Sequence, residues 1–152
     1  MKIADQVWRR ASLDSGGERP RGGDSALSGL LLAHGAIMNG GVFHAVVDVL
    51  KPEQLTAACD GFRLLGFDNI AELLKLASTT MPNSADEKSF NARYGQSIPD
   101  DSVLVEHFER HFAEHPELYA PLEEKSGGPQ APDVAKNIKA MQSAALEWKR
   151  RR

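Results

Sequence analysis

The sequence is poor in cysteine, in long apolar runs and in targeting motifs. Cys59 is the only thiol among 152 residues, so no disulfide can form within the chain and a reducing compartment is expected. No apolar run approaches the roughly 20 residues that a membrane-spanning helix requires. No N-terminal segment joins a basic start to an apolar run and a small-residue cleavage site. We therefore expect a cytoplasmic protein that makes no contact with membranes.

Catalytic motifs are missing as well. The glycine pairs at 16–17 and 22–23 lack the spacing of a phosphate-binding loop, and no Lys-Ser or Lys-Thr pair follows them. No serine or cysteine stands in a nucleophile elbow, and Cys59 lies on an apolar helical face that suits a core thiol. Asp100 and Asp101 come where a helix should begin, so we interpret them as caps rather than paired catalytic carboxylates. We predict no catalytic residue and no cofactor.

What is present is a composition ordinary for a globular protein, with an uneven distribution of charge. Hydrophobic residues make up 41% and charged residues 26% of the chain, which is long enough for one domain with a core. The formal net charge is −3 at pH 7. Residues 84–125 carry ten acidic and four basic residues, whereas residues 136–152 carry six basic residues and one acidic residue. The third quarter of the chain is therefore acidic, and its end is basic.

Apolar residues recur at helical spacing along most of the chain, which predicts an all-α fold. The predicted helices begin at or near Ile3, Asp24 or Ser25, Val42, Pro52, Asp68 or Asn69, Ser84, Pro99 and Asp133. Ser84 and Glu87 have the spacing of a capping box. Helices are expected to stop at Gly66, at Gly95 and just before Pro116, since these residues end helices.

These helices are expected to form one compact bundle of six to eight helices built on antiparallel hairpins. The clearest hairpin is the pair joined at Gly66, because its connection is short. Residues 1–125 make up the predicted helical domain, and the Gly- and Pro-rich residues 126–132 are interpreted as a linker. Residues 133–152 are predicted to form a C-terminal helix that packs on the same domain or projects from it.

The triplet Asn39-Gly40-Gly41 separates two apolar segments in the middle of the domain. Glycine adopts positive φ without strain and asparagine tolerates it, so we predict a structural chain reversal here. The segment 42–50 that follows is apolar on nearly every side, and its pattern suits a strand as well as a helix. His44 is a candidate functional side chain because turns often carry function. His34, on a Leu-rich stripe, is predicted to be packed and hydrogen-bonded instead.

The triplet, the Ala-rich helix ending in Leu64-Leu65-Gly66 and the Leu/Ala-rich helix after it occur in an order that resembles the bacterial DNA-mimic protein family. The resemblance covers residues 27–122. It implies a predominantly α-helical domain, with a helix directly after the triplet. The best-known member of that family binds a transcription factor by imitating DNA. Val42 stands where the family prefers Phe, and Ala36 and Met38 replace its usual acidic or amide residues.

Three histidines, His107, His111 and His115, follow one another at intervals of four residues on a predicted helix. Two histidines four apart can chelate a metal. However, Phe108 occupies the position where a metalloprotease helix has Glu, and no third ligand is evident. We therefore interpret the histidines as the polar flank of a helix and predict no metal. A small metal-dependent enzyme that uses these three histidines is the alternative.

Six carboxylates are predicted to contact a protein partner: Asp100, Asp101, Glu106, Glu109, Glu114 and Glu117. The same helix carries Leu104, Phe108 and Phe112 on its other side, which must face the core. We therefore expect a non-catalytic protein-interaction domain that binds a basic, DNA-binding protein through an acidic face and does not itself bind nucleic acid. An immunity-type inhibitor of a toxin is an alternative, and a homodimer remains open.

Overall fold

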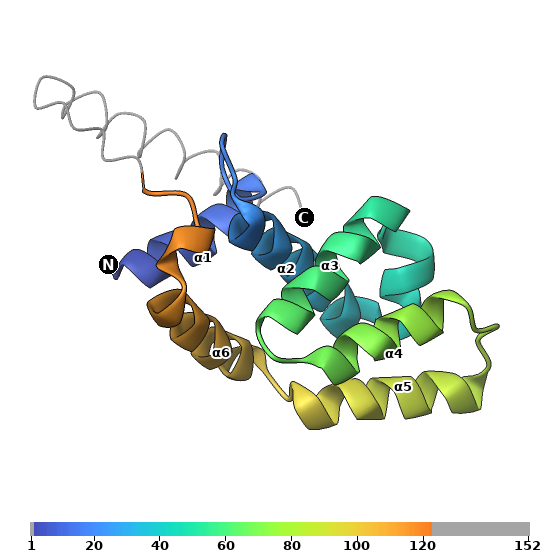
Figure 1. Cartoon of the computed structure of the whole chain (residues 1–152). Coiled ribbons are helices and arrows are strands. Elements are labelled where there is room, and N and C mark those ends of the chain that lie inside the picture. The colour runs from blue at the N-terminus through green and yellow to red at the C-terminus, as the bar shows by residue number, and fades with distance from the viewer. Residues whose placement is uncertain (1, 123–152) are drawn as a thin grey trace, which may run out of the picture. The chain divides into compact units, whose positions relative to one another are not determined.

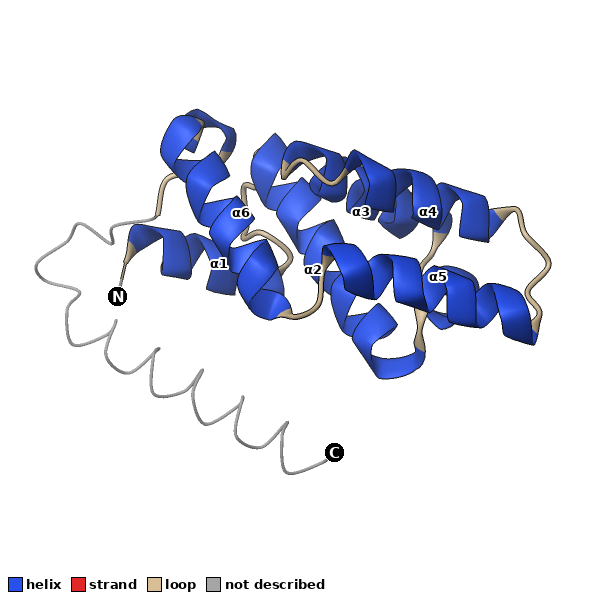
Figure 2. Cartoon of the chain, turned by 90° about the horizontal axis from the view of Figure 1, so that it is seen from below, coloured by secondary structure: helices blue, strands red, loops and turns tan. Residues whose placement is uncertain are grey.

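The computed structural model describes residues 2–122, which are helical nearly throughout and contain no strand. The described elements are α1 (Ile3–Asp14), α2 (Gly22–Gly40), the π-helix η1 (His44–Val49), α3 (Pro52–Leu64), α4 (Asp68–Ser78), α5 (Ser84–Ser97), α6 (Asp101–Glu114) and the 3-10 helix η2 (Pro116–Leu118) (Figures 1 and 2). The predicted all-α fold is therefore confirmed. One compact unit spans Met1–Ala120. The predicted linker at 126–132 and helix at 133–152 lie outside the described residues.

Helix α2 is the element around which this unit packs, and α1, α3, η1 and η2 all contact it. Its contact with α3 is especially close, because glycines stand where the two helices cross. A Cβ at Gly29 would lie 2.7 Å from the backbone of Ala57, and one at Gly61 would overlap the carbonyl oxygen of Ala26. The small residues thus bring the two backbones together and bury the apolar side of α2.

Helices α3 and α4 form the predicted hairpin, and Gly66 between them has a φ of 92° as expected of a helix-ending glycine. The predicted cap at Asp68 or Asn69 is wrong. Phe67 holds the N-cap position, and no side-chain cap bond forms there. Phe67 is buried, with its ring edge-on to Phe62. The start of α4 is therefore fixed by the packing of an aromatic ring rather than by a polar cap.

The predicted cap of α2 at Asp24 or Ser25 is also wrong, because α2 begins earlier, at Gly22. Asp24 lies within the first turn of the helix and is fully buried. Its carboxylate forms an ion pair with Arg10 of α1 at 2.7 Å. It also accepts hydrogen bonds from the backbone N–H of Arg21 at 2.9 Å and of Ala120 at 2.6 Å. Asp24 therefore joins α1, the start of α2 and the end of the compact unit.

Helix α5 differs from its prediction at both ends. Asn83 rather than Ser84 is the N-cap, and its side chain accepts a hydrogen bond from the backbone N–H of Asp86 at 2.9 Å. The helix continues through Gly95 to Ser97. Gly95 does not have the positive φ that ends a helix, and the buried side chains of Tyr94 and Ile98 hold this end of α5 against the core. Tertiary packing therefore overrides the weak helix preference of glycine.

Helix α6 begins and ends where the sequence predicts. Asp100 is its N-cap and accepts a hydrogen bond from the backbone N–H of Ser102 at 2.9 Å. The helix ends at Glu114, shortly before Pro116. Leu104 and Phe108 are buried, as their spacing requires. No described helix is both long enough and apolar enough to cross a bilayer.

Candidate functional site around the Gly41 turn

The chain breaks between α2 and the next apolar segment at a single residue, Gly41. Its φ of 96° and ψ of 174° are conformations that residues with a side chain rarely adopt. The predicted chain reversal covered Asn39, Gly40 and Gly41. Asn39 and Gly40 instead belong to the last turn of α2, so the reversal is limited to Gly41. Gly40 has a different role: a Cβ there would overlap the imidazole ring of His44, and the ring would have to shift. The two glycines thus have separate structural roles.

The segment after Gly41 is helical, as the family resemblance implied, but it is wound as a π-helix. The backbone N–H of Leu50 donates to the carbonyl of Ala45 at 2.8 Å, five residues earlier. Ala45 and Val46 are buried, whereas Val47 keeps 61% of its surface exposed. A single π-helical turn is rare and is often found at functional sites. The sequence pattern gave no sign of it, because an apolar run of this length does not resolve the helix type.

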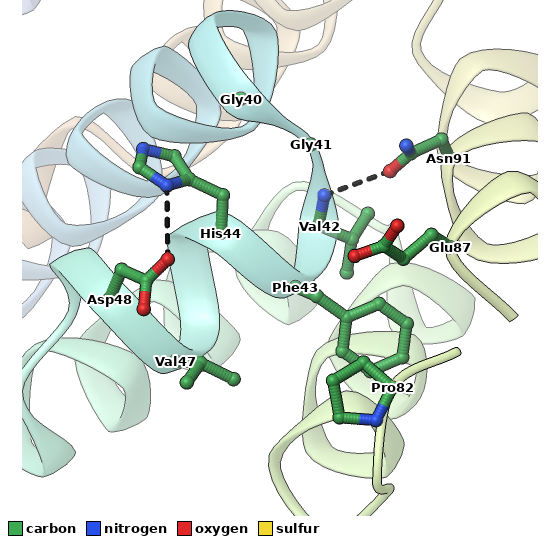
Figure 3. A pocket seen from close by; sticks show the side chains of 10 residues that line it. All are labelled: Gly40, Gly41, Val42, Phe43, His44, Val47, Asp48, Pro82, Glu87 and Asn91. Atoms are coloured by element: carbon green, nitrogen blue, oxygen red, sulfur yellow. Dashed lines mark hydrogen bonds and ion pairs between the residues drawn. The ribbon is translucent and has the colours of Figure 1, made fainter. Parts of the chain in front are cut away.

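Asn91 of α5 holds the turn in place. Its side-chain oxygen accepts a hydrogen bond from the backbone N–H of Val42 at 2.9 Å (Figure 3). That N–H lies at the start of a helical segment and has no partner within it. A Cβ at Gly41 would lie 3.0 Å from the Asn91 amide group, so the amide packs directly on the glycine. Nothing in the sequence pointed to Asn91, because 49 residues separate it from Val42.

Two open hollows lie on either side of this turn and share Gly40, Gly41 and Asn91. The first, which we call the η1 hollow, has a volume of about 260 Å³ and is drawn in Figure 3. Its lining consists of Gly40, Gly41, Val42, Phe43, His44, Val47, Asp48, Pro82, Glu87 and Asn91. The second, the α2–α5 hollow, has a volume of about 360 Å³ and lies between the end of α2 and the end of α5. The predicted turn therefore contributes to the lining of both hollows.

The η1 hollow contains three titratable side chains. His44 and Asp48, one π-helical turn apart, approach each other at 3.3 Å between Nδ1 and the carboxylate (Figure 3). Glu87 reaches from α5 toward Val42, just before η1 (Figure 3). His44 was singled out from the sequence, whereas Asp48 and Glu87 were not, because a helical carboxylate has no local signal that distinguishes it from a solvated one. The fold brings these carboxylates to one hollow from two different elements.

His107 and His111 of α6 and His115, the residue after the helix, do not all converge on one point, although the rings of His111 and His115 lie 5.1 Å apart between centroids. The Nδ1 atom of His107 lies 3.0 Å from the carbonyl oxygen of Leu65, and that of His111 lies 2.9 Å from the hydroxyl of Tyr119. His115 faces Glu117 at 3.4 Å. Among residues 2–122, no group of three or more histidines, cysteines or carboxylates is arranged to hold a metal ion.

The environment of His111 is partly apolar rather than a solvated helix flank. Burial, and to a smaller extent the neighbouring His115, lowers the pKa of His111 below its ordinary value. The ring stands edge-on to Tyr119, with 5.8 Å between ring centroids. His111 therefore connects α6 to the segment after it, and its neutral form is favoured in the folded protein.

His34 is buried and hydrogen-bonded, as predicted. Its Nδ1 lies 2.6 Å from the hydroxyl of Tyr94 and its Nε2 lies 2.6 Å from the carboxylate of Asp101. Burial raises the pKa of Tyr94 well above its ordinary value, and the Asp101 carboxylate raises it further, so the hydroxyl stays protonated. This network joins α2, α5 and α6, and its two buried members are structural.

The six carboxylates predicted to contact a partner have different environments. Three have neighbours within the chain: Asp100 caps α6, Asp101 contacts His34, and Glu117 faces His115. Hydrogen bonds from the hydroxyl and the backbone N–H of Ser102 lower the pKa of Asp100. The other three project from α6 with no ion pair to another described residue: Glu106 and Glu114, which are exposed, and Glu109, which is half-buried.

Comparisons with family models, curated proteins and solved structures returned no match to this chain. The resemblance to DNA-mimic proteins therefore rests on the residues around the turn and the helix pair after it.

Proposed function

We propose that this chain is a non-catalytic protein-interaction domain that binds a basic protein through the carboxylates of α6. The observation that supports this proposal is the arrangement of Glu106, Glu109 and Glu114 on a helix whose other side is fixed in the core. Leu104 and Phe108 on that side are almost fully buried. The helix cannot rotate without exposing them, so the carboxylates are held on the outward side.

Electrostatics favour a basic partner for this surface. Arg110 is the one lysine or arginine of α6 and lies four residues from both Glu106 and Glu114, so the three glutamates still outnumber it. A partner that carries lysine or arginine offsets this excess of negative charge. Exposed charges contribute more to the rate and specificity of association than to affinity, and each exposed ion pair adds only about 0–1 kcal/mol. A partner held by these carboxylates should therefore bind less tightly as the salt concentration rises.

DNA mimicry is the more specific form of this proposal. In this form, the basic partner is a DNA-binding protein, and the carboxylates take the places of backbone phosphates. The 14 residues of α6 extend over roughly 21 Å at the rise of an α-helix. That length suffices to offer charges to a basic binding surface along several phosphate positions. The family resemblance supports DNA mimicry, and the geometry of α6 supports the broader proposal that the chain binds a basic protein.

The test begins with co-purification from the native cells, followed by mass spectrometry of what is retained. The triple variant Glu106→Gln, Glu109→Gln and Glu114→Gln should retain less of a basic partner than the natural chain does. A matched control removes three exposed charges elsewhere, through Asp14→Asn, Glu18→Gln and Glu53→Gln. Equal loss in both variants would indicate a general effect of net charge, and no loss in the α6 variant would contradict the proposal.

A further inference from the structure

We propose that the η1 hollow is a binding site for the side chain of an arginine on the partner. This inference rests on the proposed function only in taking the partner to be basic, and it assigns a surface separate from the α6 carboxylates. The hollow is smaller than the roughly 300 Å³ at which pockets for drug-sized ligands begin. Its volume of about 260 Å³ suits one side chain rather than a whole small molecule.

The charge of the hollow selects a cation. Asp48 and Glu87 line it, and neither lysine nor arginine is among its lining residues. Among residues 2–122, Asp48 forms one ion pair, with the imidazole of His44 at 3.3 Å, so most of its hydrogen-bonding capacity remains available. Two carboxylates that line the same hollow attract a cation more strongly than either would alone. A guanidinium group can also donate several directed hydrogen bonds to them.

The apolar part of the lining favours arginine in particular. Val47 and Pro82, which are both exposed, contribute apolar surface beside the carboxylates (Figure 3). Phe43 is buried and packs on Phe90, with 4.8 Å between ring centroids, so it supports this part of the hollow from the core. An arginine side chain combines an apolar stem with a planar group that stacks on apolar and aromatic surfaces, and it is less strongly hydrated than an ammonium group. The apolar lining residues therefore complement the stem of an arginine side chain, and the carboxylates complement its guanidinium group.

The hollow is held in shape before any ligand binds. The ring of His44 packs on Gly40, and the amide of Asn91 packs on Gly41 while accepting the hydrogen bond of Val42. The π-helical winding of η1 sets the positions of both His44 and Asp48. A site whose walls are already ordered loses less conformational entropy on binding, which favours its ligand.

The experiment is a titration of the ¹⁵N-labelled full chain with the capped tripeptide Ala-Arg-Ala, followed by NMR. The control peptide carries citrulline, which has nearly the same shape as arginine and no charge. We expect the arginine peptide to shift the amide signals of Gly41, Val42 and Val47 and the side-chain amide of Asn91. We expect the citrulline peptide to leave them in place.

Variants then separate this site from the α6 surface. Asp48→Asn with Glu87→Gln should weaken binding of the arginine peptide at the hollow by about tenfold or more, which corresponds to about 1.4 kcal/mol. The triple α6 variant should leave binding there within about twofold. The inference is overturned if the peptide causes no shift at the hollow up to about 20 mM, if citrulline binds equally, or if the double variant binds as the natural chain does. In that case the proposed function still stands if partner binding depends on α6.

Discussion

Asp24 is a buried charge on which three separated parts of the chain converge. Its carboxylate contacts the guanidinium of Arg10 and the backbone N–H groups of Arg21 and Ala120. Arg10 also donates a hydrogen bond to the carbonyl of Ala120 at 2.8 Å. Removal of Asp24 takes away the buried acceptor that these three groups share, and this penalty exceeds the loss of a surface ion pair.

We predict that Asp24→Ala lowers the free energy of unfolding by about 3–5 kcal/mol, because Arg10 then lacks its buried counter-ion. Chemical denaturation followed by circular dichroism measures this change. Asp14→Ala is a suitable control, since Asp14 is exposed at the end of α1 and its replacement should change stability by at most about 0.5 kcal/mol. Equal effects of the two substitutions would mean that the buried ion pair is not a major stabilising contact.

His111 provides a pH-dependent contribution to stability. Burial lowers its pKa in the folded protein, whereas the unfolded chain binds a proton at the ordinary value of about 6.5. The stabilisation is therefore fully present above about pH 6.5, and it declines as the pH falls toward the lowered folded-state pKa, because protonation favours the unfolded chain. Its other ionisable neighbours are His115, Glu114 and Glu117, in addition to the phenol of Tyr119.

We predict that His111→Gln reduces the loss of stability between about pH 6.5 and pH 5, since the titrating group is removed. Unfolding free energies measured at several pH values test this. His115→Gln should reduce this loss by less, because it removes only the smaller contribution to the lowered pKa of His111 and leaves the half-buried imidazole in place. If the natural chain and the His111→Gln variant lose stability in parallel over this range, the burial of His111 has no consequence for folding.

At the scale of elements, the two glycines that end α2 make a sharper test than either would alone. Gly41 requires a positive φ, whereas Gly40 is helical and requires space for the His44 ring. Gly41→Val should lower the free energy of unfolding by at least about 1 kcal/mol through backbone strain. Gly40→Ala should also destabilise the protein, because the new methyl group displaces the ring.

A double variant distinguishes these two causes. We predict that His44→Ala restores most of the stability lost in Gly40→Ala and restores none of that lost in Gly41→Val. Gly35→Ala is a control of opposite sign: a Cβ there meets no atom within 4 Å, so the exposed helix should gain roughly 0.8–1.0 kcal/mol. Denaturation curves of all the variants measure these changes. Failure of His44→Ala to rescue Gly40→Ala would show that ring overlap is not the reason for glycine at that position.

Several elements were predictable because their signals are local. Gly66 stops α3, Asp100 caps α6 and the apolar stripe of α6 faces inward, all of which follow from residues close in the sequence. The wrong predictions of helix ends arise where contacts with residues distant in the sequence determine the local structure. Asp24 is drawn inward by Arg10, and the burial of Tyr94 keeps α5 helical past Gly95. The π-helical winding of η1 was beyond prediction because an apolar run supports several windings.

At the scale of the whole compact unit, the residues of the candidate site also fall into two groups: those with a local sequence signal, and those that only tertiary packing brings to the site. The sequence identified Asn39-Gly40-Gly41 and His44, which the structure places at the η1 hollow and the α2–α5 hollow. It also identified the α6 carboxylates, whose spacing opposite the buried stripe is readable from one helix. Asn91 and Glu87 were missed, because only the packing of α5 against the turn brings them there.

In the proposed function, the outward carboxylates of α6 bind a basic partner. The measurement that tests it most directly is the affinity for the co-purified partner at several salt concentrations, for the natural chain and for the variant with Glu106, Glu109 and Glu114 changed to Gln. We predict that the variant binds a few-fold to about tenfold less tightly at low salt, and that the two affinities converge as salt screens the charges. Identical affinities with identical salt dependence would contradict the account and leave the acidic side of α6 as a solvated surface.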